Sequence, residues 1–93
     1  MRIIWTPPAL RDLAAVRAYL AQFNPDAAQR QITLIVKAAS ALTQFPNIGR
    51  PGRRAGTREL VVSHTPYLLP YRLNADRIEI LRVLHASQRW PGL

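Results

Sequence analysis

The chain has 93 residues, of which 13 are basic and five acidic, so its formal net charge is +8, and it has no cysteine. This length fits one domain, and we expect residues 1–93 to fold as a unit with a thin core. The composition excludes disulfides, thiolate catalysis and cysteine-bound zinc, and it suits a reducing cytoplasm. We expect no signal peptide and no membrane span, since no apolar run is long enough. The positive charge favours acidic partners.

The first half of the chain predicts one strand and two helices. The β-branched and aromatic stretch "RIIW", residues 2–5, is typical of a strand. Thr6–Pro7 and Asn24–Pro25 each combine a capping side chain with a proline suited to the first helical position. Apolar spacing predicts helices up to Phe23 and, after the break, up to about Gln44. The short break between them predicts an antiparallel helical hairpin.

Several large side chains are expected to fill the core. On the first helix they recur at helical spacing on one face. They are Leu10, Leu13, Val16, Leu20 and Phe23, together with Trp5 before the helix and Phe45 after the second one.

The second half predicts a loop and three strands. "FPNIGRPGRRAG", residues 45–56, has three glycines and two prolines, which excludes regular structure. Strands follow at residues 57–62, 67–73 and 77–84, the last of them nearly continuous in apolar residues, as in an interior strand. Pro70 inside the middle strand requires an edge, a bulge or solvent beside it, because it has no N–H to donate.

The element order is therefore β-α-α-β-β-β. It predicts an α+β fold, in which an antiparallel sheet carries the α-helical hairpin on one face. Two helices cannot cover both faces, so the other face should remain partly open.

Three stretches give the sequence a likeness to a known family. "FPNIGRPG" followed by "GTREL", then "YLLPYRL", then "IEILRVLHASQRW" resemble, in this order, the loop and last three strands of the RelE/ParE superfamily of bacterial type II toxins. The likeness covers nearly the whole chain. It implies an antitoxin partner that wraps around the toxin, in a hetero-oligomeric complex. For ParE-like members it implies an acidic antitoxin with a ribbon-helix-helix DNA-binding end, and DNA gyrase as the target.

The superfamily also contains RelE-like endonucleases that cut mRNA on the ribosome, and the sequence departs from their pattern. Leu68 follows Tyr67 where those nucleases carry an arginine, and Ala86 and Ser87 stand where they carry a basic residue. Cutting RNA at a 2′-hydroxyl needs a base, an acid and a cation at the scissile phosphate. We therefore expect a ParE-like gyrase poison without a catalytic centre.

Two alternatives to the gyrase poison remain. In an mRNA endoribonuclease, the residues implied by the resemblance would be Arg58, Arg82 and His85. A basic nucleic-acid-binding module without toxicity is suggested by charge alone.

The candidate binding residues are mostly arginines. The arginines of the loop form either a solvated surface or an electrostatic contact for an acidic partner, and we expect the contact. Arg82, on the last strand, could point from the uncovered sheet face towards a partner, while a tryptophan beside an arginine near the end could anchor an interface. No cofactor or metal is expected, because two histidines without clustered acids do not form a metal site. The partner-binding set is Arg50, Arg53, Arg54, Arg58, Arg82, Arg89 and Trp90.

Overall fold

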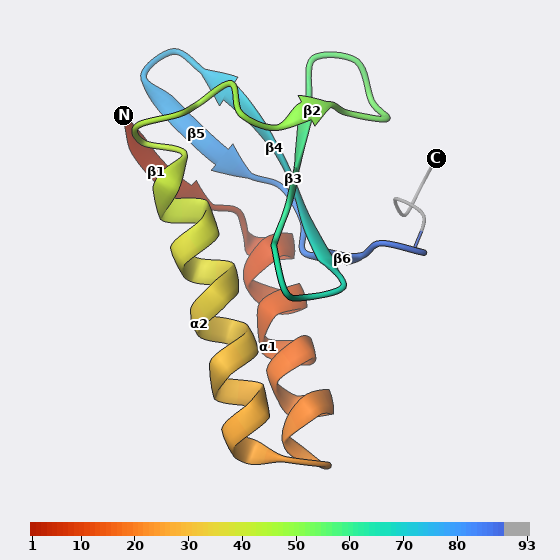
Figure 1. Cartoon of the computed structure of the whole chain (residues 1–93). Helices are drawn as coiled ribbons and strands as arrows, with labels where there is room; N and C mark the ends of the chain where they lie inside the picture. The colour runs from red at the N-terminus through yellow and green to blue at the C-terminus, as the bar shows by residue number, and fades with distance from the viewer. Residues whose placement is uncertain (89–93) are drawn as a thin grey trace.

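The computed structural model describes residues 1–88 and confirms the predicted α+β fold, with a helical hairpin on one face of a sheet (Figure 1). One helix of the hairpin follows the first strand directly, and the remaining strands follow the second helix. In chain order the elements are β1 (Arg2–Trp5), α1 (Pro7–Ala21), α2 (Pro25–Ala41), β2 (Arg50–Pro51), β3 (Arg58–Val61), β4 (Tyr67–Asn74), β5 (Arg77–Ile80) and β6 (Leu84–His85). No helix within residues 1–88 is long and apolar enough to cross a membrane.

Both helices begin where the capping signals predict. The Thr6 hydroxyl accepts a hydrogen bond from the backbone N–H of Ala9, and the Asn24 side chain accepts one from Ala27. Each cap is followed by proline at the first helical position, where a missing N–H costs nothing. The second helix ends at Ala41, three residues before the predicted end, and turns follow it.

The sheet is mixed, with the strand order β1-β5-β4-β3-β2, and β6 also pairs with β4. The predicted antiparallel pairing holds for the strands of the second half. It is wrong for β1, which lies parallel to β5 with Ile3 opposite Ile78. More than 70 residues separate these two partners, so no tight turn fixes their relative direction. The loop prediction also needs correction, because Arg50–Pro51 form a short strand beside β3.

The main core lies between the helices and the sheet. Ile32, Ile35, Ala39 and Leu42 from the second helix and its end pack with the buried side chains of β4 and β5, including Leu69, Tyr71, Ile78 and Ile80. Trp5 packs against this core, as predicted.

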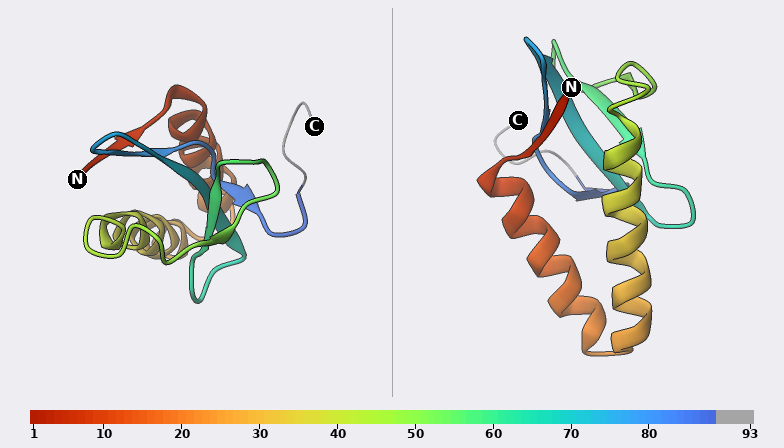
Figure 2. Two further views of the ribbon diagram at one scale, coloured as in Figure 1. Left: turned by 90° about the horizontal axis from the view of Figure 1, so that it is seen from above. Right: turned by 90° about the vertical axis from the view of Figure 1, so that its left-hand side faces the viewer.

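Three predicted core residues are wrong. Phe45 is 57% exposed because the helix ends earlier and Leu42 occupies the core position. Leu10 is about half exposed, on the side of α1 away from the core. Phe23 is 72% exposed because the far ends of both helices extend beyond the sheet (Figures 1 and 2).

The predicted strand 77–84 is interrupted. Tyr71 pairs with Ile80, and Leu68 pairs with Leu84. Two residues of β4 therefore face three residues, 81–83, on the other side, which is a β-bulge.

Pro70 explains the position of this bulge. Its carbonyl accepts a hydrogen bond of 2.8 Å from the N–H of Leu81, but proline has no N–H to return. The Leu81 carbonyl instead lies 3.2 Å from the donating hydroxyl of Thr6, at the start of α1. The conflict at Pro70 is resolved by a bulge, one of the three solutions that the sequence allows.

Candidate functional site

The arginine-rich loop is anchored to the core through the Tyr71 hydroxyl. This buried hydroxyl accepts a hydrogen bond from the backbone N–H of Gly49 and donates one to the carbonyl of Pro46. A Cβ on Gly49 would lie 2.6 Å from the Tyr71 ring, so only glycine fits there. The loop therefore starts from a fixed point on β4.

Glu59 lies beneath the loop and binds two of its arginines. Its carboxylate accepts hydrogen bonds from the backbone N–H and the side chain of Arg53, at 2.9 and 3.0 Å, and lies 3.4 Å from the Arg50 guanidinium. The side chain of Glu59 is only 2% exposed. Burial by itself raises the pKa of this carboxyl, but the bonds and charge of Arg53, with help from Arg50, hold the pKa below its ordinary value of 4.5. The nearest acid in sequence thus neutralises part of the loop's charge.

The other loop arginines also have partners. The guanidinium of Arg58 donates to the carbonyls of Asn47 and Gly49, so it closes the loop on itself. Arg53 also donates to the carbonyl of Gln88 and so ties the loop to the C-terminal segment. Arg54 is half-buried. Its carbonyl accepts a hydrogen bond from the Thr57 hydroxyl. In this structure the loop arginines hold the loop together as well as contributing charge.

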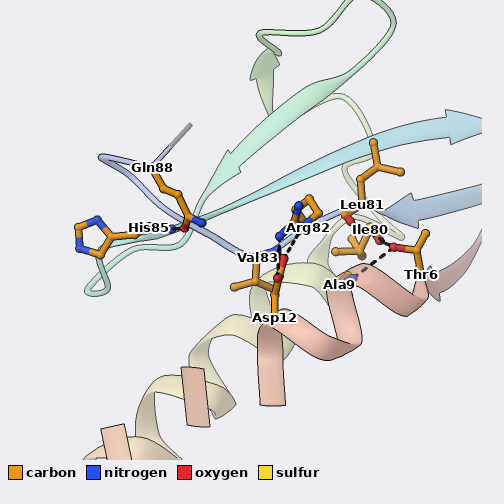
Figure 3. Close-up of polar contacts among 9 residues, drawn as sticks. All are labelled: Thr6, Ala9, Asp12, Ile80, Leu81, Arg82, Val83, His85 and Gln88. Atoms are coloured by element: carbon orange, nitrogen blue, oxygen red, sulfur yellow. Dashed lines mark hydrogen bonds and ion pairs between the residues drawn. The ribbon is translucent and has the colours of Figure 1, made fainter. Parts of the chain in front are cut away.

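Arg82 is bound by the first helix (Figure 3). Its Nε and Nη2 donate to the two oxygens of Asp12 at 2.6 and 2.8 Å, and the N–H of Val83 donates to the same carboxylate at 3.0 Å. The hydrogen bonding that Arg82 donates to Asp12, stronger than the opposing effect of burial, raises the pKa of Arg82. Arg82 thus does not point from the uncovered sheet face, because the bulge turns it towards α1.

The three residues of the nuclease alternative are not brought into one centre. Arg58 pairs with Tyr71 and His85 with Tyr67, positions four residues apart on β4, which is about 13 Å along a strand. Arg82 has its charge partner in Asp12.

His85 is exposed beside the end of the sheet. Its Nδ1 lies 2.8 Å from the Ser87 hydroxyl, and its ring makes an edge contact with Tyr67. Burial, with a smaller effect of Tyr19, raises the pKa of Tyr67. Arg89 and Trp90, also predicted to bind a partner, lie outside the described residues.

Leu68 does not supply a cation to this end of the sheet. It is 2% exposed and forms a small apolar cluster with Leu84, with Leu81 packed against it. The position at which the nuclease pattern carries an arginine is thus part of a buried apolar cluster.

An exposed apolar groove, which the sequence did not predict, runs between α2 and the edge of β3. It comprises adjoining hollows of about 300 to 400 Å³ each, the central one about 400 Å³. We call it the α2–β3 groove; its main lining residues are Leu34, Lys37, Ala38, Ile48, Leu60 and Val61. Ile48 and Val61 are more than half exposed. The one signal of the groove in the sequence is Val61. It is apolar but lies on the strand face opposite to Leu60 and Val62, as expected of an exposed apolar side chain.

The groove is open to a partner in two further ways. β2 pairs only with Arg58 and Glu59, so the rest of β3, Leu60–Val61, has a strand partner on one side only within residues 1–88. The basic residues Arg30, Lys37 and Arg50 border the groove, while Glu59, the one acid that lines it within the described residues, is buried and ion-paired.

This arrangement of strands and helices is that of known toxins. The chain superposes with a TM-score of 0.84 and 32% identity on a chain from the chromosomal ParDE toxin–antitoxin system of P. aeruginosa, over 91% of this chain and 95% of that one. On a chain of the RelBE2 toxin–antitoxin complex from Mycobacterium tuberculosis it superposes with a TM-score of 0.62 and 29% identity, over 90% of this chain and 95% of that one. The fold is that of the RelE/ParE superfamily of type II toxins.

Sequence comparison gives the narrower assignment. Residues 3–90 match the family model of the ParE toxin of the type II toxin–antitoxin system parDE, so the chain belongs to this family. It is 50% identical over 90 residues to Y4kP of Sinorhizobium fredii, covering 97% of this chain and 93% of that protein. It is 40% identical over 87 residues to the toxin RelE2 of Caulobacter vibrioides, covering 94% of this chain and 97% of that protein. Both ParE and RelE names thus occur among its relatives.

Proposed function

We propose that this toxin acts in the cytoplasm by binding DNA gyrase, and that a cognate antitoxin neutralises it. The observation that carries the proposal is that residues 1–88 bring no proton-transfer centre together. Leu68 is buried and apolar, Arg58 and Arg82 are bound within the fold, and His85 lies apart from Arg58 along the sheet. A toxin with this surface can act by binding, whereas RNA cleavage needs groups arranged around one phosphate.

The test compares two purified targets. Added toxin should stop DNA supercoiling by gyrase and leave mRNA on translating ribosomes intact. Site-specific cuts in ribosome-bound mRNA, with gyrase unaffected, would reverse the assignment. The His85→Ala variant separates the two cases further, because it should retain gyrase inhibition but would abolish cleavage by a nuclease that uses His85.

The ribosome-dependent endoribonuclease is the second candidate. Two observations favour it: a relative of 40% identity is named RelE2, and His85 is exposed beside a tyrosine ring whose hydroxyl has a raised pKa. In that case His85 would carry the proton transfer, with Arg82 and Arg58 as the cations.

For the antitoxin we propose the α2–β3 groove as the docking site. The solved relatives come from ParDE and RelBE toxin–antitoxin systems, which supports a partner of the same kind in a hetero-oligomeric complex. An acidic, amphipathic segment would fit the groove: its apolar side chains would cover Ile48 and Val61, and its carboxylates would meet Lys37 and Arg50. An extended part could add a strand beside Leu60–Val61. A ribbon-helix-helix end on that antitoxin would let the complex bind DNA.

The proposal assigns distinct roles to the predicted arginines. Arg50 is 59% exposed and borders the groove, so it would contact antitoxin carboxylates directly. Arg53 and Arg58 would hold the loop in shape, while Arg54, Arg89 and Trp90 stay predicted contacts. Arg50→Glu should slow antitoxin association and weaken its salt dependence, as stopped-flow binding at several salt concentrations would reveal. An unchanged salt dependence would remove Arg50 from the interface.

A further inference from the structure

A second hollow, remote from the α2–β3 groove, has three arginines in its wall. It has a volume of about 450 Å³ and lies where the loop after β2, the bulge and the start of α1 meet. We call it the arginine hollow; its lining includes Thr6, Arg54, Thr57, Arg72, Leu81 and Arg82. It shares no lining residue with the groove, and no carboxylate lines it within residues 1–88.

Two of the three guanidinium groups of the hollow are held in place by acidic side chains. Asp12 binds Nε and Nη2 of Arg82, and Glu79 binds Nε of Arg72. Within residues 1–88, Nη1 of Arg82 and both terminal nitrogens of Arg72 have no hydrogen-bond partner, and the Arg72 side chain is 52% exposed. The acids therefore fix the two side chains and leave donors available for a ligand.

The backbone around the hollow is fixed as well. The Thr57 hydroxyl donates to the carbonyl of Arg54, and Gly52 donates to the carbonyl of Thr57. A Cβ on Gly52 would lie 2.1 Å from the Thr57 hydroxyl, so the close approach requires glycine. On the other side the Thr6 hydroxyl donates to Ile80 and Leu81 (Figure 3). A ligand would meet donors that are already positioned.

The positive charge continues from the hollow across the open sheet face. Arg72 on β4 lies opposite Glu79 on β5, and Arg77 on β5 lies opposite Arg2 on β1. Side chains alternate along β5, so these four residues point to the sheet face opposite the core residues Ile78 and Ile80. Arg72 and Arg77 share the single carboxylate of Glu79. This row of cations suits a ligand whose negative charges repeat along a chain.

We propose that the arginine hollow binds the phosphodiester backbone of a nucleic acid. One phosphate would take the terminal nitrogens of Arg72 and Arg82, since guanidinium groups match phosphate oxygens in pairs. The adjoining sugar or base would lie against Leu81 and the neighbouring Pro8 and Ala55, and further phosphates would follow the row towards Arg77 and Arg2. The interaction is binding without cleavage. It does not depend on DNA gyrase being the target.

The experiment measures fluorescence anisotropy of short labelled oligonucleotides with the purified full chain, between about 50 and 200 mM salt. Three variants each lower the net charge by one. Arg72→Gln removes a proposed phosphate donor, while Glu79 keeps Arg77 as its partner. Ala55→Glu places a carboxylate on the exposed rim of the hollow, and Arg30→Gln removes an exposed arginine of α2 as the matched control.

Arg72→Gln and Ala55→Glu should each lower affinity about tenfold. Arg72→Gln should also reduce the slope of log affinity against log salt by about one. Arg30→Gln should change either quantity little. Equal losses in all three variants would mean diffuse attraction to a basic protein and would overturn the site, as would no binding by the original chain at about 100 mM salt.

Two further probes distinguish the sources of the ligand. Single-stranded DNA, duplex DNA and RNA of the same sequence identify which nucleic acid the hollow prefers, and a preference for any of them supports the proposal. An oligoglutamate peptide of matched length tests for a carboxylate site. If it binds as tightly as the nucleic acids and depends equally on Arg72, the hollow is a peptide site and the proposal is wrong.

Discussion

Single carboxylates decide much of the geometry of this toxin. Asp12 accepts three hydrogen bonds from the bulge, and Glu59 accepts three from the arginine loop. Both acids are mostly buried, and each binds a guanidinium together with a backbone N–H. Removing such an acid leaves both a guanidinium and a backbone N–H without their partner. Its loss should therefore lower the free energy of unfolding more than the loss of a surface ion pair.

Asp12→Asn should lower the free energy of unfolding by about 1–3 kcal/mol, because an amide cannot neutralise Arg82. Asp26→Asn in the first turn of α2 is the matched control, where the lost interaction with the helix dipole costs about 0.3–1 kcal/mol. Urea unfolding of both variants measures the difference. Equal midpoints would show that the contact with Arg82 adds nothing beyond surface charge.

The depressed pKa of Glu59 makes stability depend on pH. Its folded pKa lies below the ordinary value of 4.5, so its contribution is complete above about pH 4.5 and is lost as pH falls through the folded pKa. The unfolding midpoint should therefore drop in acid, and Glu59→Gln should be less stable than the original chain at pH 7 but lose less on acidification.

Glu79 provides the comparison for this pH series. The hydrogen bond from Arg72 lowers the pKa of Glu79 against a smaller, opposing effect of burial. The pKa is thus shifted in the same direction as that of Glu59, but the Glu79 side chain is more exposed. Glu79→Gln should leave most of the acid dependence intact. If Glu59→Gln retains the full dependence instead, the buried carboxylate is not its source.

At the scale of elements, the loop between α2 and β3 is held in a defined conformation by hydrogen bonds and ion pairs. The buried hydroxyl of Tyr71 links two of its backbone groups, and Arg58 binds two of its carbonyls. The short strand β2 and the ion pairs of Glu59 hold its second half. The loop can thus present Arg50 and Arg54 at fixed positions on two different surfaces.

Tyr71→Phe should destabilise the chain by about 1–3 kcal/mol, because it leaves the N–H of Gly49 and the carbonyl of Pro46 without their partner. Tyr19→Phe removes a hydroxyl from an exposed tyrosine of α1 and should cost less than about 0.5 kcal/mol. Thermal and urea unfolding measure both. A small effect at Tyr71 would mean that water replaces the hydroxyl without loss.

At the scale of the whole molecule, the two surfaces proposed for partners within residues 1–88 differ in chemistry. The α2–β3 groove is apolar with a basic border, and the arginine hollow is basic with apolar walls. The hairpin end, with exposed Tyr19 and Phe23, lies away from the sheet (Figure 2). Antitoxin docking should therefore be sensitive to the groove and insensitive to the hairpin end.

Val61→Lys should weaken the complex with the antitoxin at least tenfold, since it places a charge in the apolar groove. It should barely change the stability of the toxin alone, because Val61 is exposed. Phe23→Lys, at the hairpin end, is the control for lost exposed apolar surface. Isothermal titration with the antitoxin measures both, and equal losses would place the antitoxin elsewhere or over both sites.

The sequence by itself determined the local structure. Thr6, Asn24 and the prolines after them set the helix starts, and alternation set the strands, because these signals act within a few residues. Pro70 predicted an irregularity in the sheet, but it did not distinguish a bulge from an edge or a solvent contact. The motifs also sufficed for the superfamily and for the absence of a cation at Leu68.

Only the tertiary structure decided the partners of the charged groups. Arg82 and Asp12 are 70 residues apart, and Arg53 reaches Gln88 across 35. Such pairs form because the bulge, the parallel β1–β5 pairing and the helical hairpin bring distant segments together, and no local pattern encodes them. The same holds for the groove and the arginine hollow, since a concave surface exists only once separate elements meet.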